Sequence, residues 1–181
     1  MRNLTAISAI VLAAVANAAP LAAAPAGEIE CIIKDWTEAQ YADVYAGLFN
    51  KSGPPSAAEQ RGTGLLTGRI TECAQANHWS EGAISAAMSY SSAQIFVQIV
   101  GNQIAREGGS TAVLDHHFSA NRAEMIGLTE IPQIDVLQLG PRLVEEGFAP
   151  ANSPAYKSVS IYFCFLALRE QARELFLEHD S

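Results

Sequence analysis

The residue types best suited to acid–base chemistry lie close together in one segment of the sequence. Asp115 is followed directly by His116 and His117, and Glu124 lies seven residues after His117. Histidine changes charge near neutral pH, and a neighbouring carboxylate can orient its ring. This segment is therefore a candidate catalytic cluster for a hydrolytic enzyme, and with a further ligand such as His78 it could bind zinc.

The spacing of these residues argues against a metal site. Adjacent histidines on a helix point about 100° apart, so that one site cannot readily use both His116 and His117. The sequence contains no His-Glu-x-x-His and no Glu-x-x-His motif, which are typical of zinc proteases and of di-iron helical bundles. We therefore predict no metal and no cofactor, and we retain a hydrolase using His116, His117 or Glu124 only as an alternative.

A cluster of glycines, Gly62, Gly64 and Gly68, falls inside an expected helix. A phosphate-binding loop needs a preceding strand and a defined glycine spacing, and this segment has neither. We expect instead that the glycines allow a neighbouring helix to approach closely, or that they weaken the helix locally by up to about 1 kcal/mol each.

A regular polar stripe runs through residues 82–105, which carry no charged side chain. Four residues recur there at every fourth position and share one slanted face of a helix: Tyr90, Gln94, Gln98 and Asn102. An apolar stripe for the core is formed by Ile84, Met88, Ile95 and Ile99. Because an exposed helix of this length normally carries charges, we expect a central helix at 81–107 that the other helices surround.

Two arrangements would satisfy the amides of this polar stripe. An unpaired buried amide costs about 1–3 kcal/mol, so each amide needs a hydrogen-bond partner. Neighbouring helices can supply the partners in a structural network, or the stripe can line a groove and bind a ligand. We favour the network because polar contacts in cores are common. In a groove, Tyr90, Gln94, Gln98 and Asn102 are the predicted ligand contacts.

The three cysteines divide into an expected pair and a free thiol. Cys31 lies about 22 residues before the turn at Gly53-Pro54 and Cys73 about 19 after it, so a helical hairpin brings them within disulfide range. We predict a Cys31–Cys73 bridge, with a stabilisation of up to about 4 kcal/mol. Cys164 lies in an apolar run, which favours a buried thiol whose pKa is raised rather than a nucleophile.

Helical spacing of apolar residues recurs along the chain, whereas the alternation typical of strands is absent. With caps and Gly or Pro stops, it predicts six helices at 28–50, 56–76, 81–107, 110–127, 131–146 and 153–179. A capping box at Thr37 and Gln40 allows a break near Asp35, and Gly140-Pro141 should kink or split the fifth helix. The charged residues of the last helix, including Arg169 and Glu170, are expected to face water. Short connections imply a compact all-α bundle.

The N-terminus has the pattern of a secretory signal peptide. Arg2 precedes an apolar run, and Ala16-Asn17-Ala18 resembles a cleavage site. We predict a signal peptide at 1–18, with cleavage as late as residue 26 as the alternative, and one helical domain at 27–181. Pro20 and Pro25 interrupt this Ala-rich segment, which argues against a membrane anchor. The mature chain is expected in the periplasm or outside the cell, without a membrane span.

Composition limits the functions that remain. The chain has 181 residues, 49% of them hydrophobic, and a formal net charge of −8. This fits one globular domain and excludes a disordered chain, and the lack of a basic cluster argues against nucleic-acid binding. We predict an exported, soluble, non-enzymatic domain that binds a protein or small ligand along the polar stripe, with its oligomeric state left open. The alternatives are the hydrolase and a structural or assembly protein of the cell envelope.

Overall fold

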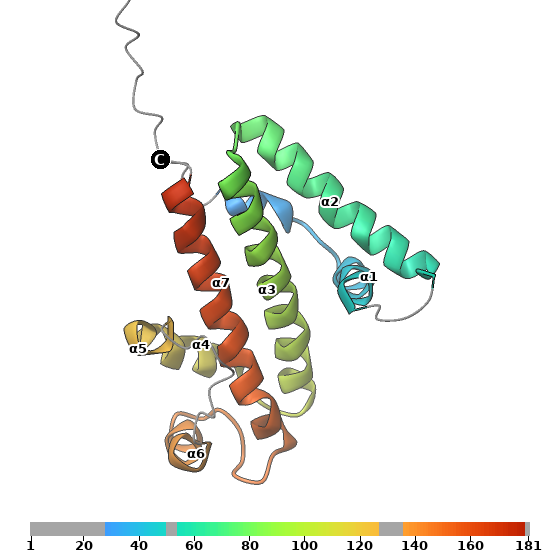
Figure 1. The fold of residues 1–181 in the computed structure, drawn as a ribbon. Coiled ribbons are helices and arrows are strands. Elements are labelled where there is room, and N and C mark those ends of the chain that lie inside the picture. Colours follow the sequence, from blue (N-terminus) through green and yellow to red (C-terminus); the bar gives the residue numbers. More distant parts are fainter. Residues whose placement is uncertain (1–27, 50–53, 127–135, 180–181) are drawn as a thin grey trace, which may run out of the picture.

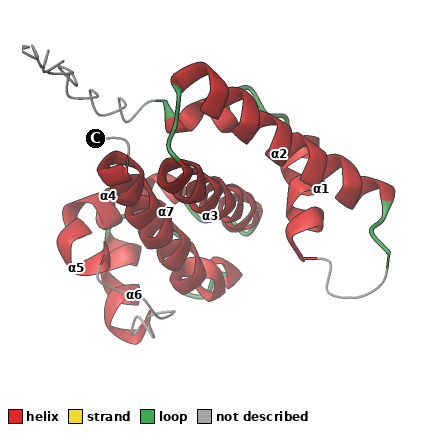
Figure 2. Ribbon diagram, turned by 45° about the horizontal axis from the view of Figure 1, so that its top comes forward, coloured by secondary structure: helices red, strands yellow, loops and turns green. Residues whose placement is uncertain are grey.

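The computed structural model describes residues 28–49, 54–126 and 136–179, and all regular structure within these ranges is helical (Figure 2). The elements are η1 (Ile29–Ile32), α1 (Glu38–Phe49), α2 (Ala57–Asn77), α3 (Glu81–Arg106), α4 (Thr111–Ala120), α5 (Arg122–Ile126), α6 (Val136–Glu145), η2 (Pro154–Ser158) and α7 (Val159–His179), where η marks a 3-10 helix. The predicted all-α bundle is confirmed. The signal peptide predicted at 1–18 lies outside the described residues.

The antiparallel pair α3 and α7 forms the centre of the molecule (Figure 1). The Ser80 hydroxyl, at the start of α3, donates to the carbonyl of His179 at the end of α7. At the opposite end, the Ser153 hydroxyl donates to the carbonyl of Glu107. Figure 1 shows α1 and α2 on one side of this pair and α4, α5 and α6 on the other. The pair therefore separates two groups of helices.

The buried face of α3 agrees with the predicted one at Ile84, Ile95 and Ile99 and differs from it at Met88. Met88, assigned to the core stripe, is 49% exposed. The buried face is built from small residues and Tyr90, with Ile95 and Ile104 at 0% exposure: Ala83, Ala86, Ala87, Ala93 and Gly101. Small side chains let the neighbouring helices approach closely, so they take the core positions and leave Met88 at the edge. The middle of the central helix is thus covered on all sides, since every residue from 90 to 102 is buried or partly buried, whereas Ser85 and Ser89 near its start reach solvent.

The first predicted helix is two separate elements. The chain leaves η1 through Asp35, whose φ of 63° is left-handed and cannot continue a helix. Gln40 N–H donates to the Thr37 hydroxyl, and the Gln40 side chain accepts from Thr37 N–H, as a capping box requires. The break near Asp35 is therefore confirmed, and the continuous helix 28–50 is wrong. Similarly, the helix expected at 110–127 is divided into α4 and α5 at Asn121.

Local signals at other helix ends are confirmed. Ser56 caps α2 in a reciprocal capping box with Glu59, and the hydroxyl of Ser80 accepts from Ala83 N–H at the start of α3. Ser153 caps η2 in the same way. Pro141 lies inside α6, which continues to Glu145, so the predicted split of this helix does not occur.

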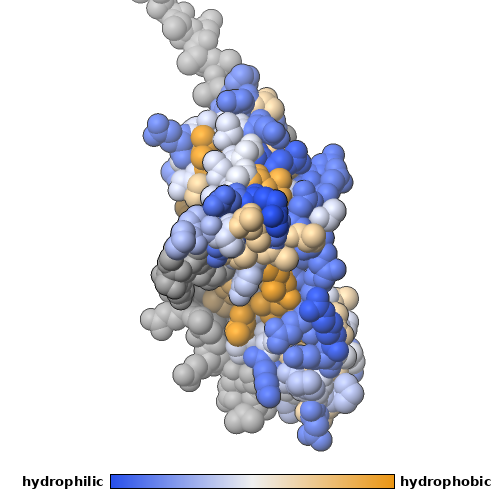
Figure 3. Space-filling view, turned by 90° about the vertical axis from the view of Figure 1, so that its right-hand side faces the viewer, coloured by the Kyte–Doolittle hydropathy of each residue, from blue (hydrophilic) through white to orange (hydrophobic). Residues whose placement is uncertain are grey.

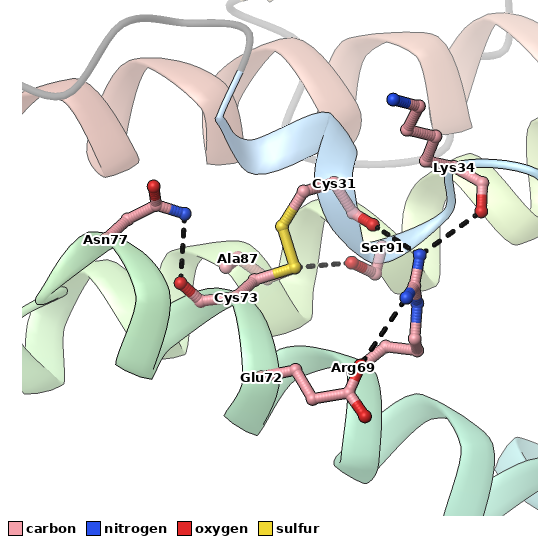
Figure 4. Close-up of a disulfide and its surroundings, with 8 residues drawn as sticks. All are labelled: Cys31, Lys34, Arg69, Glu72, Cys73, Asn77, Ala87 and Ser91. Carbon is pink, nitrogen blue, oxygen red and sulfur yellow. Dashed lines mark hydrogen bonds and ion pairs between the residues drawn. A yellow bond between two sulfur atoms is a disulfide. The ribbon is translucent and has the colours of Figure 1, made fainter.

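A disulfide and an arginine fix η1 against α2 (Figure 4). Cys31 and Cys73 are bonded, with their Cα atoms 6.3 Å apart, which agrees with the predicted pairing. The reason differs from the prediction, because Cys31 lies on η1 and not on the helix that forms the hairpin with α2. The Arg69 guanidinium donates to the carbonyls of Cys31 and Lys34 at 3.1 and 3.3 Å. Two independent contacts therefore hold η1 in place.

Of the three clustered glycines, only Gly62 allows close packing of α2 against α1. A Cβ atom on Gly62 would lie 2.1 Å from the carbonyl oxygen of Asp43 on α1, whereas at Gly64 and Gly68 it would meet no atom within 4 Å. In Figure 1, α1 is seen end-on while α2 lies in the plane of the view. The two helices therefore cross steeply, and Gly62 is where their backbones approach.

Candidate functional site

The polar stripe of α3 divides between two clefts. The first, the α4 cleft, lies among α3, α4 and α7 and encloses about 360 Å³. Its polar lining includes Gln94, Gln98, Asn102, Asp115, Tyr162 and Arg169. The second, the η1 cleft, lies among η1, α3 and α7, encloses about 700 Å³, and contains Tyr90. Gln94 and Arg169 line both clefts, so they form a shared wall.

The amides of the stripe are only partly satisfied by protein atoms. Gln98 Nε2 donates to Asn102 Oδ1 at 3.3 Å, and Gln94 Oε1 accepts from Arg169 at 3.0 Å. Among the described residues, Gln98 Oε1, Asn102 Nδ2 and Gln94 Nε2 have no hydrogen-bond partner. The stripe thus combines the two arrangements considered from sequence, because some of its amide atoms bond protein groups and others, on residues that line the clefts, do not.

A tyrosine–aspartate pair forms the wall opposite the stripe. The Tyr162 hydroxyl donates to Asp115 Oδ1 at 3.0 Å. Burial, and then the negative charge of Asp115, raise the pKa of Tyr162 well above its ordinary value. The phenol therefore stays protonated at physiological pH, and it holds the carboxylate in place as a donor.

Glu170 is buried, which corrects the prediction that it faces water. It is 8% exposed, and its carboxylate accepts from Arg122 at 3.2 Å and from Arg169 at 3.1 Å. These two cations compensate for the loss of hydration that burial of a carboxylate entails. The same ion pairs orient Arg169, whose remaining guanidinium nitrogen bonds Gln94. Arg122 thereby helps to position the shared wall of the two clefts.

The histidine cluster does not contribute to either cleft. His117 is buried against the ring of Phe163, with its Nδ1 3.6 Å from the carboxylate of Glu146. His116 is exposed, and His78 ends α2 in a left-handed conformation. Glu124 belongs to α5, and its side chain lies outside the described part of the structure. In that described part, no three His, Cys, Asp or Glu side chains come together as metal ligands.

Cys164 is a half-buried free thiol whose pKa is raised by burial.

Aromatic rings join α1 to the central pair of helices. Phe96 stacks on Phe165 with ring centroids 3.9 Å apart, and Tyr45 packs edge-on against Phe96. Viewed from the side of α1 and α2, hydrophobic atoms gather near the middle of the face beside hydrophilic ones (Figure 3).

One helix of the described residues is long and apolar enough to cross a membrane. This is α3, and half of its most apolar window is buried within the protein. The core helix of a globular protein meets the same criteria of length and composition, and α3 packs along α7 as such a helix.

Sequence reasoning overlooked Asp115 as a cleft residue, along with Tyr162 and Arg169. The sequence suggests Asp115 only as a partner of His116 or His117, and Arg169 only as a charge that faces water. One signal was available for Arg169, since it directly follows the apolar run of the last helix and so stands at the edge of the core. The chain matches no protein-family model, no curated protein and no solved structure.

Proposed function

We propose that this chain is an exported, non-enzymatic binding domain that holds a small neutral polar molecule in the α4 cleft. The observation that carries the proposal is that Gln94, Gln98 and Asn102 line this cleft and each has an amide atom without a hydrogen-bond partner among the described residues. They offer both donors and an acceptor. A volume of about 360 Å³ falls within the range of small-molecule sites, which is about 300–1,000 Å³.

The charges of the α4 cleft favour a neutral ligand. Asp115 already accepts from Tyr162, and Arg169 is already engaged by Gln94 and Glu170. Charges that are compensated in this way leave hydrogen bonding as the main means of recognition. Hydroxyl and amide groups, which donate and accept, match the free amide atoms of the stripe.

Binding rather than catalysis is proposed because the cleft holds no free acid–base group among the described residues that line it. The carboxylate of Asp115 is bonded, and Tyr162 has a raised pKa. His116 and His117 lie outside the cleft lining. This arrangement gives the hydrolytic alternative no support.

Export is part of the same proposal and rests on the signal-peptide pattern at 1–18. A bonded pair of cysteines is compatible with an oxidising compartment such as the periplasm or the cell exterior. To test export, the host cells are fractionated and the N-terminus of the protein is determined. We expect the protein in the envelope fraction or the medium, without its first residues.

Substituting single residues of the stripe should weaken binding without unfolding the domain. Gln98→Leu and Asn102→Leu are each expected to weaken binding about tenfold, since each leaves ligand groups unpaired in the cleft. Binding is measured by saturation-transfer NMR with saccharides, polyols and small amides, and by native mass spectrometry of protein purified from its own host.

Gln103→Leu provides the matched control. It makes the same chemical change on the same helix, but Gln103 is exposed and lies outside both clefts. It should leave binding unchanged. The proposal is rejected if no neutral compound binds, or if Gln103→Leu weakens binding as much as Gln98→Leu does. Loss of folding in Gln98→Leu would assign that residue to a structural network instead.

Assembly is a second candidate function, favoured by one face of α7. Ile161, Leu168 and Leu175 are 43%, 38% and 48% exposed, and they recur every seven residues. Seven residues make nearly two helical turns, so the three side chains form one apolar stripe along the helix. A stripe with this repeat is the kind of surface that packs against another helix.

One charged substitution in the apolar stripe of α7 should prevent self-association. Leu168→Lys is expected to convert a concentration-dependent dimer into a monomer in sedimentation velocity, because an unpaired ammonium would be buried at the contact. Leu48→Lys is the control, since Leu48 is equally exposed, at 39%, but lies on α1. A wild-type chain that remains monomeric at high concentration eliminates this candidate.

A further inference from the structure

The η1 cleft gathers positive charge in an acidic protein. Its lining includes Lys34, Arg169 and Arg173, which are three of the eleven Lys and Arg residues of a chain with net charge −8. Two acidic residues, Glu30 and Glu170, lie in the same lining. The balance inside the cleft is therefore opposite in sign to that of the protein as a whole.

The positive charges in this cleft differ in whether they already form ion pairs with carboxylates of the protein. Glu170 accepts from both Arg122 and Arg169, so this carboxylate and Arg169 are bound to each other. Lys34 and Arg173 form no ion pair with any residue that the structure describes. Against them stands Glu30 alone, which also has no ion pair within the described ranges. The cleft thus keeps two cations available to a ligand.

Tyr90 supplies a hydrogen-bond donor in the same place. Its side chain lines the η1 cleft and is only 5% exposed. The hydroxyl has no hydrogen-bond partner among the described residues, although the charges of Arg169, Glu30 and Arg173 act on it. The ring is buried, but the hydroxyl is not among the enclosed polar atoms that lack a partner, so it is open to the cleft. The Tyr90 hydroxyl is therefore available as a donor to a ligand acceptor.

We propose that the η1 cleft binds a small organic anion, carrying a carboxylate or a phosphate, that is held by Lys34, Arg173 and the Tyr90 hydroxyl. Carboxylates and phosphates share a negative charge and acceptor oxygens, which these three groups recognise. Ile33 and the Cys31 end of the disulfide give the cleft an apolar wall, which suits the organic part of such a ligand. This proposal does not require a ligand in the α4 cleft, although the two clefts share Gln94 and Arg169.

Calorimetric titration of the mature protein tests the proposal. Succinate and benzoate form the carboxylate arm, and inorganic phosphate and glycerol phosphate form the phosphate arm. At least one arm should bind with a Kd of about 1 mM or tighter, and the affinity should fall as salt screens the charges. The arm that binds identifies the anionic group. Failure of all four compounds to bind overturns the proposal.

Three variants locate the site. Arg173→Gln should weaken anion binding about tenfold, and Tyr90→Phe about fivefold, as expected for one charge-assisted and one neutral hydrogen bond. Arg142→Gln is the matched control, because Arg142 is an exposed cation on α6 outside both clefts. Equal losses in Arg142→Gln and Arg173→Gln would mean non-specific attraction and would refute the site.

A stability measurement separates a binding role of Tyr90 from a structural one. Tyr90→Phe keeps the buried ring and removes only an unpaired hydroxyl, so its Tm should stay the same or rise. A marked fall in Tm would assign the hydroxyl to the fold and would contradict the proposal. Gln98→Leu should leave anion binding unchanged, so that failure of the α4-cleft proposal and failure of this one give different results.

Discussion

Gly62→Ala should be among the most destabilising single substitutions in this chain. The added Cβ would lie 2.1 Å from the Asp43 carbonyl oxygen and 2.5 Å from the backbone nitrogen of Val44. Both obstacles are backbone atoms, so that α1 and α2 must move apart. Overpacking of this kind costs about 1–3 kcal/mol or more, which exceeds the gain of about 1 kcal/mol from replacing glycine by alanine in a helix.

The measurement is thermal and denaturant unfolding of three alanine variants. For Gly62→Ala we expect a net loss of about 2 kcal/mol, which lowers Tm by about 4–8 °C in a domain of this size. Gly64→Ala and Gly68→Ala are matched controls in the same helix with open space around them. Each should gain up to about 1 kcal/mol. If all three variants were stabilised alike, the close crossing of α1 and α2 would be wrong.

Removing the disulfide should cause the largest loss of stability. Cys31 and Cys73 are 42 residues apart in sequence, and the loop-entropy relation assigns a bridge of that span about 4 kcal/mol as an upper figure. The double substitution of both cysteines by alanine should approach this value, because the bridge restricts the unfolded chain. Arg69 still binds η1 in the variant, so native structure should persist at low temperature.

Denaturant unfolding of the double variant, and of the wild type under reducing conditions, gives the comparison. Cys164→Ala serves as the control, since Cys164 is free and half-buried and its loss should cost far less. The double variant should also bind the anionic probes of the η1 cleft more weakly, because Cys31 lines that cleft. A loss below about 1 kcal/mol would contradict the expected role of the bridge.

Features specified by neighbouring residues were predictable from sequence. Ser56, Ser80 and Ser153 cap their helices through bonds to residues two or three positions away, and Thr37 and Gln40 do the same. Such bonds depend on nothing distant in the chain. The extents of α2 and α3 agree with the prediction to within one residue, whereas the helix expected at 153–179 begins as the 3-10 helix η2 and becomes α7 only at Val159. The cysteine pairing agreed although η1 was not foreseen.

Features that depend on distant residues were not predictable in this way. Glu170 is buried because Arg122, 48 residues earlier, reaches it from α5.

The polar stripe is divided between the η1 cleft and the α4 cleft for a geometric reason. Four residues advance about 40° beyond a full helical turn, so from Tyr90 to Asn102 the stripe winds about 120° around α3. It therefore faces η1 at one end and α4 at the other.

The guanidinium of Arg169 lines both the α4 cleft and the η1 cleft, and it cannot bind a ligand in either cleft without a change in its present hydrogen bonds. A ligand in the η1 cleft that engages it draws on the same donors that now hold Gln94 and Glu170. Occupancy of one cleft would then alter the amide available in the other, which is energetic coupling between two sites. Thermodynamic reciprocity requires that each ligand change the affinity of the other by the same factor. Arg169 is therefore the side chain through which a ligand in one proposed site would affect a ligand in the other.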